Sequence, residues 1–364
     1  MIVHPRSVPA SRFLARMVAY EVGNGSGRLS RLAPLAGTAL ALRHALGPRR
    51  PDQAVEDVLD KLHADWPRLV AAADRLPDHP PDRDAMAVLV VERSSARTVF
   101  VFASDATPLL VAKLGDVAVE EAALTRARPA RATPAPLGRV AGAFVQEGVP
   151  GLPVPLPEVG SAEVLSLRWS PAFRSLGRAV ARIGEVTATR TDQAPGELAE
   201  PLDAAVADEL LPDAVRPAVA AAARDVRRVP VSVLRHGDLS GQNWLVDKGE
   251  VTGLVDWETA VDDGVPGFDV LHAAVSWFHH VLARSGASEQ SVAAGFEAAW
   301  DRSPFFAGAR RAALDAAAAV GVPAPLHDSL VVAFFVRRLG RRLRFGPNDA
   351  RTVTARRMLD AVCR

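Results

Sequence analysis

Residues 233–258 constrain the fold of this chain more than any other segment. Two β-rich apolar runs, Trp244-Leu-Val246 and Val251-Thr-Gly-Leu-Val255, are joined by the polar stretch Asp247-Lys-Gly-Glu250. A short glycine-containing turn between two such runs is typical of a hairpin. We therefore predict that the runs pair as antiparallel strands.

Three polar side chains lie at the ends of this hairpin. Asp238 precedes Asn243 by five residues, and Asp256 ends the return strand within a residue or two of the level of Asn243. Mg²⁺ prefers oxygen ligands and is commonly held by one or two carboxylates, while water and phosphate oxygens complete its shell. Asn243 and Asp256 therefore form a candidate metal site. Asp238 is ionised at neutral pH, since an ordinary aspartate has a pKa of about 3.9, and it is a candidate base for a substrate hydroxyl.

A loop aspartate, an asparagine five residues later and a second aspartate after a hairpin make up the arrangement that kinases use for phosphoryl transfer. The motifs His236-Gly-Asp238-Leu-x-x-x-Asn243, Val255-Asp-Trp-Glu258 and Gly264-Val-Pro-Gly-Phe-Asp269 resemble those of the aminoglycoside phosphotransferase and choline kinase family. They differ from the His-Arg-Asp and Asp-Phe-Gly motifs of protein kinases. The motifs span residues 235–269, and weaker matches extend the resemblance to about residue 110.

The resemblance implies an α+β, two-lobed, protein-kinase-like fold, with a small antiparallel sheet in the N-terminal lobe and a mostly helical C-terminal lobe. It implies ATP and Mg²⁺ as cofactors and a hydroxylated small molecule as the acceptor. Asp238 would be the catalytic base, Asn243 and Asp256 the metal ligands, and Asp269 a structural residue.

Three β-rich runs, at 87–92, 98–103 and 108–114, predict the sheet of the N-terminal lobe. Lys113 lies in the third run and is one of only three lysines among 43 basic residues, so lysine at this position is informative. The run resembles the Val-Ala-x-Lys strand whose lysine binds ATP phosphates. A solvent-facing lysine on an edge strand is the alternative.

The acidic partner of this lysine is expected in the helix-forming run that comes next. Glu120 is the preferred candidate, with Leu124 four residues later on the buried face, and Glu121 is the reserve. The spacing of seven residues between Lys113 and Glu120 is shorter than is usual in the family. A solvated helix charge is the alternative for either glutamate.

An apolar strand at 143–147 runs into a Pro- and Gly-rich segment that resembles the hinge of the family. Backbone groups of Glu147 to Val149 would bind adenine there. A plain linker between lobes would fit the same residues, because Gly and Pro stop helices in either case.

The expected domains are a partly helical N-terminal extension at 1–82, a nucleotide-binding sheet and hinge at 83–149, and a helical lobe with the catalytic loop and substrate site at 150–364. In the extension, four apolar residues recur at helical spacing, namely Val55, Val58, Leu59 and Leu62. The glycines between Gly23 and Gly27 are not expected to cradle phosphates, since no strand precedes them.

Helices dominate the rest of the predicted C-terminal lobe. Ser170 followed by Pro171 is a typical helix start, a second helix is expected over 213–227, and everything after Asp269 is expected to be helical. Arg235 is expected to be structural and His236 to brace its loop. Three histidines on an apolar helix, His272, His279 and His280, are expected to be packing residues. The basic run 336–345 is expected to be a solvated helix face, with an anionic partner as the alternative.

The composition narrows the set of partners. The formal charge of +1 provides no overall field that would attract nucleic acid or an anionic membrane. The single cysteine, Cys363, forms no disulfide framework, and the N-terminus lacks the apolar core of a signal peptide, so a reducing cytoplasm is expected. The oligomeric state is left open.

The leading hypothesis is an ATP- and Mg²⁺-dependent phosphotransferase, and the alternative is a catalytically silent nucleotide-binding or scaffolding protein of the same fold. No P-loop, Gly-x-Ser-x-Gly or His-Glu-x-x-His motif is present, which argues against P-loop kinases, hydrolases and zinc enzymes. Apart from Asp262-Asp263 there is no dense acidic cluster, so a sugar, amino alcohol or other metabolite is preferred over a polycationic aminoglycoside.

Overall fold

The computed structural model describes residues 2–3, 53–81, 87–92, 96–102, 107–154, 169–191 and 195–364. By its contacts the chain forms two compact units. The first contains Met1–Pro155, Asn243–Lys248 and Thr252–Glu258, and the second contains Leu156–Gln242, Gly249–Val251 and Thr259–Arg364. The predictions for Gly23 to Gly27 lie outside the described residues.

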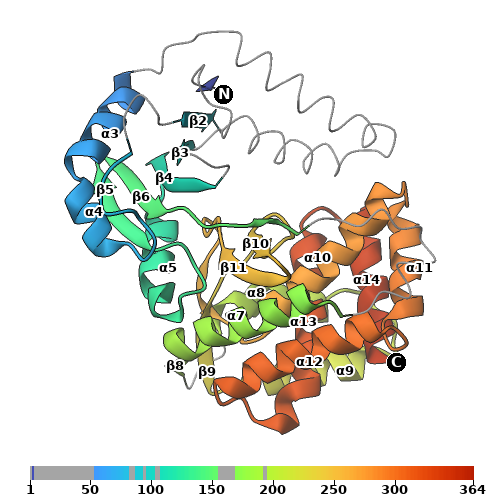
Figure 1. Ribbon diagram of the computed structural model, residues 1–364. Coiled ribbons are helices and arrows are strands. Elements are labelled where there is room, and N and C mark those ends of the chain that lie inside the picture. Colours follow the sequence, from blue (N-terminus) through green and yellow to red (C-terminus); the bar gives the residue numbers. More distant parts are fainter. Residues whose placement is uncertain are drawn as a thin grey trace. The chain divides into compact units, whose positions relative to one another are not determined.

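A six-stranded antiparallel sheet with the order β1-β2-β3-β4-β6-β5 forms the body of the first unit (Figure 1). Its strands are β1 (Ile2–Val3), β2 (Ala87–Glu92), β3 (Ala96–Phe102), β4 (Pro108–Gly115), β5 (Pro136–Val140) and β6 (Ala143–Glu147). The three β-rich runs predicted from the sequence are confirmed within two residues. Since β4 pairs with β3 and β6, Lys113 lies on a central strand, and the edge-strand alternative is wrong.

Two helices share a core with this sheet, α3 (Gln53–Ala64) and α4 (Trp66–Ala72). The residues predicted for the apolar face of α3 are all buried, and they pack with Val90, Val99 and Val145 of the strands. Contacts therefore place this part of the expected N-terminal extension in the same unit as the sheet. The helices and the sheet cover each other's apolar faces, and neither would bury its apolar face alone.

A second, three-stranded sheet of order β11-β10-β7 is built from β7 (Leu152–Pro153), β10 (Trp244–Asp247) and β11 (Glu250–Leu254). The predicted hairpin is thus confirmed. Its turn residues Lys248 and Gly249 have φ angles of 49° and 84°. Two successive positive φ angles are those of a type I′ turn, whose twist matches that of paired strands.

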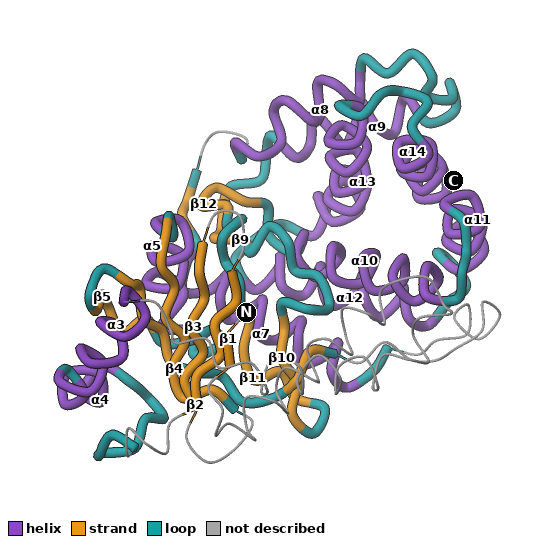
Figure 2. The backbone as a smooth tube through the Cα atoms, turned by 90° about the horizontal axis from the view of Figure 1, so that it is seen from above, coloured by secondary structure: helices purple, strands orange, loops and turns teal. Residues whose placement is uncertain are grey.

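Helices make up most of the second unit (Figure 2). They are α7 (Pro171–Thr187), α8 (Ala199–Val206), α9 (Arg216–Val226), α10 (Phe268–Arg284), α11 (Glu289–Ala299), α12 (Pro304–Ala319), α13 (His327–Leu343) and α14 (Ala350–Cys363), with short 3₁₀ turns at Gly196–Leu198 and Ala324–Leu326. The predicted start of α7 is confirmed, since the Ser170 hydroxyl accepts a hydrogen bond from the Phe173 N–H at 3.3 Å. Aromatic rings of Phe296, Trp300, Phe306 and Phe335 pack together in the core of this unit.

A third small sheet, of order β12-β9-β8, carries the loop at 236–243. It consists of β8 (Thr189–Arg190), β9 (Val231–Arg235) and β12 (Val261–Gly264), and every residue of β9 is buried. The α+β class predicted from the sequence is confirmed by an antiparallel sheet in one unit and a mostly helical second unit. Within the described part of the chain, no helix is both long and apolar enough to span a bilayer.

Candidate functional site

Lys113 is held between two carboxylates in the first unit. Its Nζ atom lies 2.8 and 2.6 Å from the two carboxylate oxygens of Glu120, and 3.2 Å from Oδ1 of Asp256. The predicted pairing with Glu120 is therefore confirmed. The reserve candidate Glu121 instead accepts hydrogen bonds from Arg139 at 3.0 and 2.6 Å.

The short spacing between Lys113 and Glu120 is made possible by a sharp turn. Gly115 ends β4 with a φ of 126°, a conformation that other residues rarely adopt. The helix α5 (Ala118–Ala127) begins three residues later, so its first turn presents Glu120 to Lys113. The shortened segment therefore does not prevent the ion pair.

Glu120 is almost completely buried, with 1 % of its surface exposed. Burial raises the pKa of its carboxyl, and the positive charge and hydrogen bond of Lys113 oppose this rise. A backbone hydrogen bond from Trp257 also favours the ionised form. Glu120 thus connects the lysine to the segment that carries Asp256.

Asn243 and Asp256 come together as the hairpin predicted. The Val255 N–H donates to the Asn243 carbonyl at 2.8 Å, so the two candidate metal ligands are carried by adjacent backbone. Asp256 has a φ of 67°, which is uncommon for a residue other than glycine and typical of functional sites.

The donor set of these two residues fits Mg²⁺. A carboxylate and an amide oxygen are ligands that Mg²⁺ prefers, and a nucleotide would supply further phosphate oxygens. No cluster of three or more His, Cys, Asp or Glu residues suited to a metal occurs in the part of the chain that the structure describes. A protein-only cage such as a structural zinc site is thus not found there.

Glu147 and Val149 lie where β6 leaves the sheet. The Gly148 N–H between them donates to the Leu109 carbonyl at 2.7 Å, and a Cβ atom on residue 148 would lie 1.7 Å from the Pro108 carbonyl oxygen. Only glycine fits this contact. The Glu147 carboxylate accepts a hydrogen bond from the Arg75 N–H, and burial raises its pKa, so this side chain is engaged within the unit. The Val149 N–H makes no backbone hydrogen bond within the described residues.

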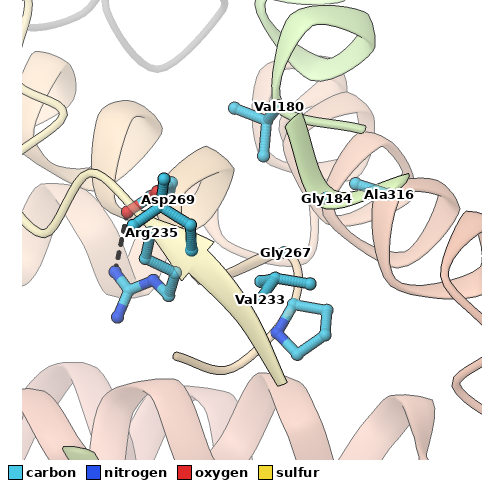
Figure 3. A pocket seen from close by; sticks show the side chains of 9 residues that line it. Val180, Gly184, Val233, Arg235, Gly267, Asp269 and Ala316 are labelled. Carbon is cyan, nitrogen blue, oxygen red and sulfur yellow. Dashed lines mark hydrogen bonds and ion pairs between the residues drawn. The ribbon is translucent and has the colours of Figure 1, made fainter. Parts of the chain in front are cut away.

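In the second unit, Asp269 fixes the backbone of the loop that bears Asp238. Its carboxylate accepts hydrogen bonds from the His236 N–H at 2.7 Å, from the Gly237 N–H at 3.3 Å and from Arg235 at 2.8 Å. Although burial opposes ionisation, Arg235 and the histidine outweigh it and keep the pKa of Asp269 below its usual value. The predicted structural role of Asp269 is confirmed. Figure 3 shows its ion pair with Arg235 at the end of β9.

Arg235 belongs to a buried ion-pair network. It also pairs with Glu197, which in turn contacts Arg337 at 2.6 Å. Arg337 is 3 % exposed, so the prediction that 336–345 is a solvated helix face is wrong at this residue. Arg341 and Arg344 of the same run are exposed, as predicted.

Asp238 projects from the loop with 54 % of its side chain exposed. Its Oδ1 atom lies 3.3 Å from Nε2 of His272, and the same nitrogen lies 3.2 Å from the Ser276 hydroxyl. The hydrogen bond with His272 lowers the pKa of Asp238, while burial lowers the pKa of His272. The interpretation of His272 as a packing residue is therefore wrong, because its ring is bonded to the candidate base.

Comparisons with known proteins bear on this site. A family model described as phosphotransferase enzyme family matches residues 110–314, which is more than half of the chain. The search of curated proteins gave no match.

Three solved structures are among those similar to this chain. They are a macrolide 2′-phosphotransferase from Brachybacterium faecium (20 % identity, 75 % of this chain and 91 % of that one, TM-score 0.42), a putative aminoglycoside phosphotransferase from Ralstonia eutropha (14 %, 83 % and 97 %, 0.46) and a putative fructosamine-3-kinase from Thermobifida fusca (16 %, 76 % and 91 %, 0.42). With identities of 20 % or lower and TM-scores below 0.5, these similarities assign no role to any residue of this chain.

Proposed function

Because this chain belongs to the phosphotransferase enzyme family, we propose that it transfers the γ-phosphate of ATP to a hydroxyl group of a small molecule in an Mg²⁺-dependent reaction. The observation that carries this proposal is the position of Lys113 between Glu120 and Asp256. In kinases a lysine held by a glutamate positions the nucleotide phosphates, and an aspartate after a hairpin holds the metal. Lys113 joins Glu120, seven positions later, to Asp256, 143 positions later.

Each candidate site residue of the first unit has a role in this proposal. Lys113 contacts the nucleotide phosphates, and Glu120 keeps the ammonium group in place. Backbone groups of Glu147 and Val149 bind adenine, for which the Val149 N–H is a suitable donor. Asp256 and Asn243 hold the metal. Mg²⁺ bound to the phosphates would neutralise the charge that develops during transfer.

Asp238 is the proposed catalytic base. The acceptor oxygen forms a bond to the γ-phosphorus, the bond from that phosphorus to the bridging oxygen of ADP breaks, and the hydroxyl proton passes to the Asp238 carboxylate. The lowered pKa of Asp238 keeps it ionised at neutral pH. His272 is a positioning residue, since its hydrogen bond restricts the carboxylate to one orientation.

Nucleotide binding can be tested before the acceptor is known. A ligand that binds only the folded state stabilises it by RT ln(1 + [L]/Kd), about 2.7 kcal/mol at a hundredfold excess over Kd. Titration of the wild type with Mg–ADP should therefore raise the melting temperature. Asp256→Ala and Lys113→Ala should abolish or strongly weaken this rise, whereas Lys61→Ala and Lys248→Ala, which change exposed lysines, should retain it.

Turnover is tested with a panel of hydroxylated metabolites and a coupled assay for ADP. Asp238→Asn should bind Mg–ADP as the wild type does and lose nearly all turnover, because the base contacts no nucleotide group. Turnover of this variant within twofold of the wild type would remove Asp238 from the mechanism. A wild type that neither binds Mg–ADP nor consumes ATP would refute the proposal, and one that binds without turnover on any acceptor would favour a silent nucleotide-binding protein.

A further inference from the structure

Four helices of the second unit succeed one another around a ring, α10, α11, α14 and α13 (Figure 2). Neighbours are in contact from α10 to α11, from α11 to α14 and from α14 to α13. Between α13 and α10 the rings of Phe334 and Phe268 close the circle, with centroids 5.5 Å apart. These two phenylalanines therefore mark the sides of α10 and α13 that face each other.

One row of residues on each of these faces is polar. Residues four positions apart form a row along a helix. From Phe268 this row of α10 continues through His272, Ser276 and His280, with His279 beside it. From Phe334 the corresponding side of α13 continues through Arg338 and Arg342. The histidines of α10 and the two arginines of α13 therefore lie close to His272, the residue that contacts Asp238.

Arg338 has no partner of opposite charge in this cluster. Its side chain makes no hydrogen bond or ion pair with any residue that the structure describes, whereas the adjacent Arg337 pairs with Glu197. Burial and the nearby Arg342 lower the pKa of Arg338 to about 10, and Glu289 is the one carboxylate that opposes them. Glu289 is itself engaged, since it lies 3.1 Å from Nε2 of His279.

The surroundings of Arg338 are otherwise cationic or neutral. Its positive charge contributes to the lowered pKa values of His272, His279 and His280, all of which are lowered chiefly by burial. Arg342 acts on Arg338 from one helical turn away and is balanced in part by Asp349. A half-buried guanidinium without a counter-ion is unfavourable, because it has lost water without gaining a partner.

We propose that the acceptor of this enzyme carries an anionic group, a phosphate or a carboxylate, which is bound by Arg338 with help from Arg342 and the α10 histidines. The inference rests on the proposed function, because it identifies the acceptor by the groups next to Asp238. A guanidinium fork matches both kinds of anion and forms charge-assisted hydrogen bonds with them. A polycationic acceptor would instead be repelled by the same arginines.

Four sugars that share one ring provide the test: glucose 6-phosphate, glucuronate, glucose and glucosamine. Binding of each, and of inorganic phosphate, is measured by calorimetry on the full-length protein in saturating Mg–ADP. At least one of the two anionic sugars should bind about tenfold more tightly than glucose and glucosamine, which is the effect of one hydrogen bond to a charged group. Comparison of glucose 6-phosphate with glucuronate distinguishes phosphate from carboxylate recognition.

Substitutions of Arg338 test whether the anionic group binds at this residue. Arg338→Gln should weaken the anionic sugar about tenfold or more, and Arg338→Lys should restore part of the loss. Arg178→Gln is the matched control, because Arg178 is exposed and pairs with Glu250 on the surface.

The inference is overturned if neither anionic sugar nor phosphate binds at millimolar concentration, if glucose or glucosamine binds as tightly as both anions, or if Arg338→Gln has no effect. Mg–ADP binding is measured separately on the same samples. Loss of nucleotide binding alone would count against the proposed function, and loss of anion binding alone would count against the assignment of the acceptor.

Discussion

Removal of the Asp269 carboxylate should destabilise the second unit severely. The side chain is 4 % exposed and accepts hydrogen bonds from Arg235 and from two backbone N–H groups of the loop before Asp238. Asp269→Ala leaves all three donors without this acceptor. The variant therefore tests whether the loop is held by a buried ion pair, as its geometry indicates.

The expected magnitude can be worked out from the individual contacts. Loss of one partner of a buried ion pair costs about 3–5 kcal/mol, and the lower end applies because Arg235 keeps its pairing with Glu197. The buried His236 N–H, left without a partner, adds about 1 kcal/mol. The bond from Gly237, at 3.3 Å, contributes little. We expect a loss of about 4 kcal/mol, or about 10 °C in melting temperature for a unit of this size.

Thermal and urea unfolding monitored by circular dichroism would measure this loss. The control is Asp213→Ala, since the Asp213 side chain is fully exposed in its pair with Arg216 and should change stability by less than about 0.5 kcal/mol. The pKa of Asp269 is lowered in the folded state, so its contribution is complete above about pH 4 and is lost as the pH falls through the folded-state pKa. A loss below about 1 kcal/mol at pH 7 would refute the reasoning.

Three further predictions concern nucleotide binding and the pH dependence of activity. Glu120→Gln should weaken nucleotide binding about tenfold or more, because it removes the charge that holds Lys113, and Glu121→Gln should bind Mg–ADP like the wild type. His272→Ala should raise the pKa of Asp238, so the acidic limb of the pH–kcat profile should move to higher pH; an unchanged profile would show that the hydrogen bond has no influence on the base. Gly148→Ala should reduce nucleotide binding through a displaced hinge, since its Cβ atom would overlap the Pro108 carbonyl, and wild-type binding by a stable variant would contradict this.

Much of the first unit could be predicted because its signals are local. The strands are indicated by β-rich runs of four to eight residues, and the hairpin by a Lys-Gly turn whose two positive φ angles only a few residue types accept. The proximity of Asn243 and Asp256 is then a consequence of strand pairing alone. Glu120 is buried in α5 together with Leu124, whereas Glu121 is partly exposed and pairs with Arg139.

The role of His272 could not be predicted by the same reasoning. An apolar helix with an occasional histidine has the same pattern whether that histidine packs in a core or meets a loop 34 residues earlier in the chain. The missing information is the angle at which α10 leaves the turn held by Asp269, which no periodicity encodes. A polar residue one turn after an anchoring aspartate is the signal that would have pointed to this contact.

Arg337 and Arg338 are a second case in which the sequence could not predict the role of a residue. They are adjacent in sequence and chemically identical, yet successive residues on a helix point about 100° apart, so each meets a different part of the protein. Arg337 pairs with Glu197, which also pairs with Arg235. Arg337 is therefore part of the buried ion-pair network that contains Arg235. Arg338 meets helix α10, where the histidines are poor counter-ions and Glu289 is engaged with His279. The difference between a structural arginine and a candidate ligand-binding arginine therefore lies in the partner that tertiary folding supplies.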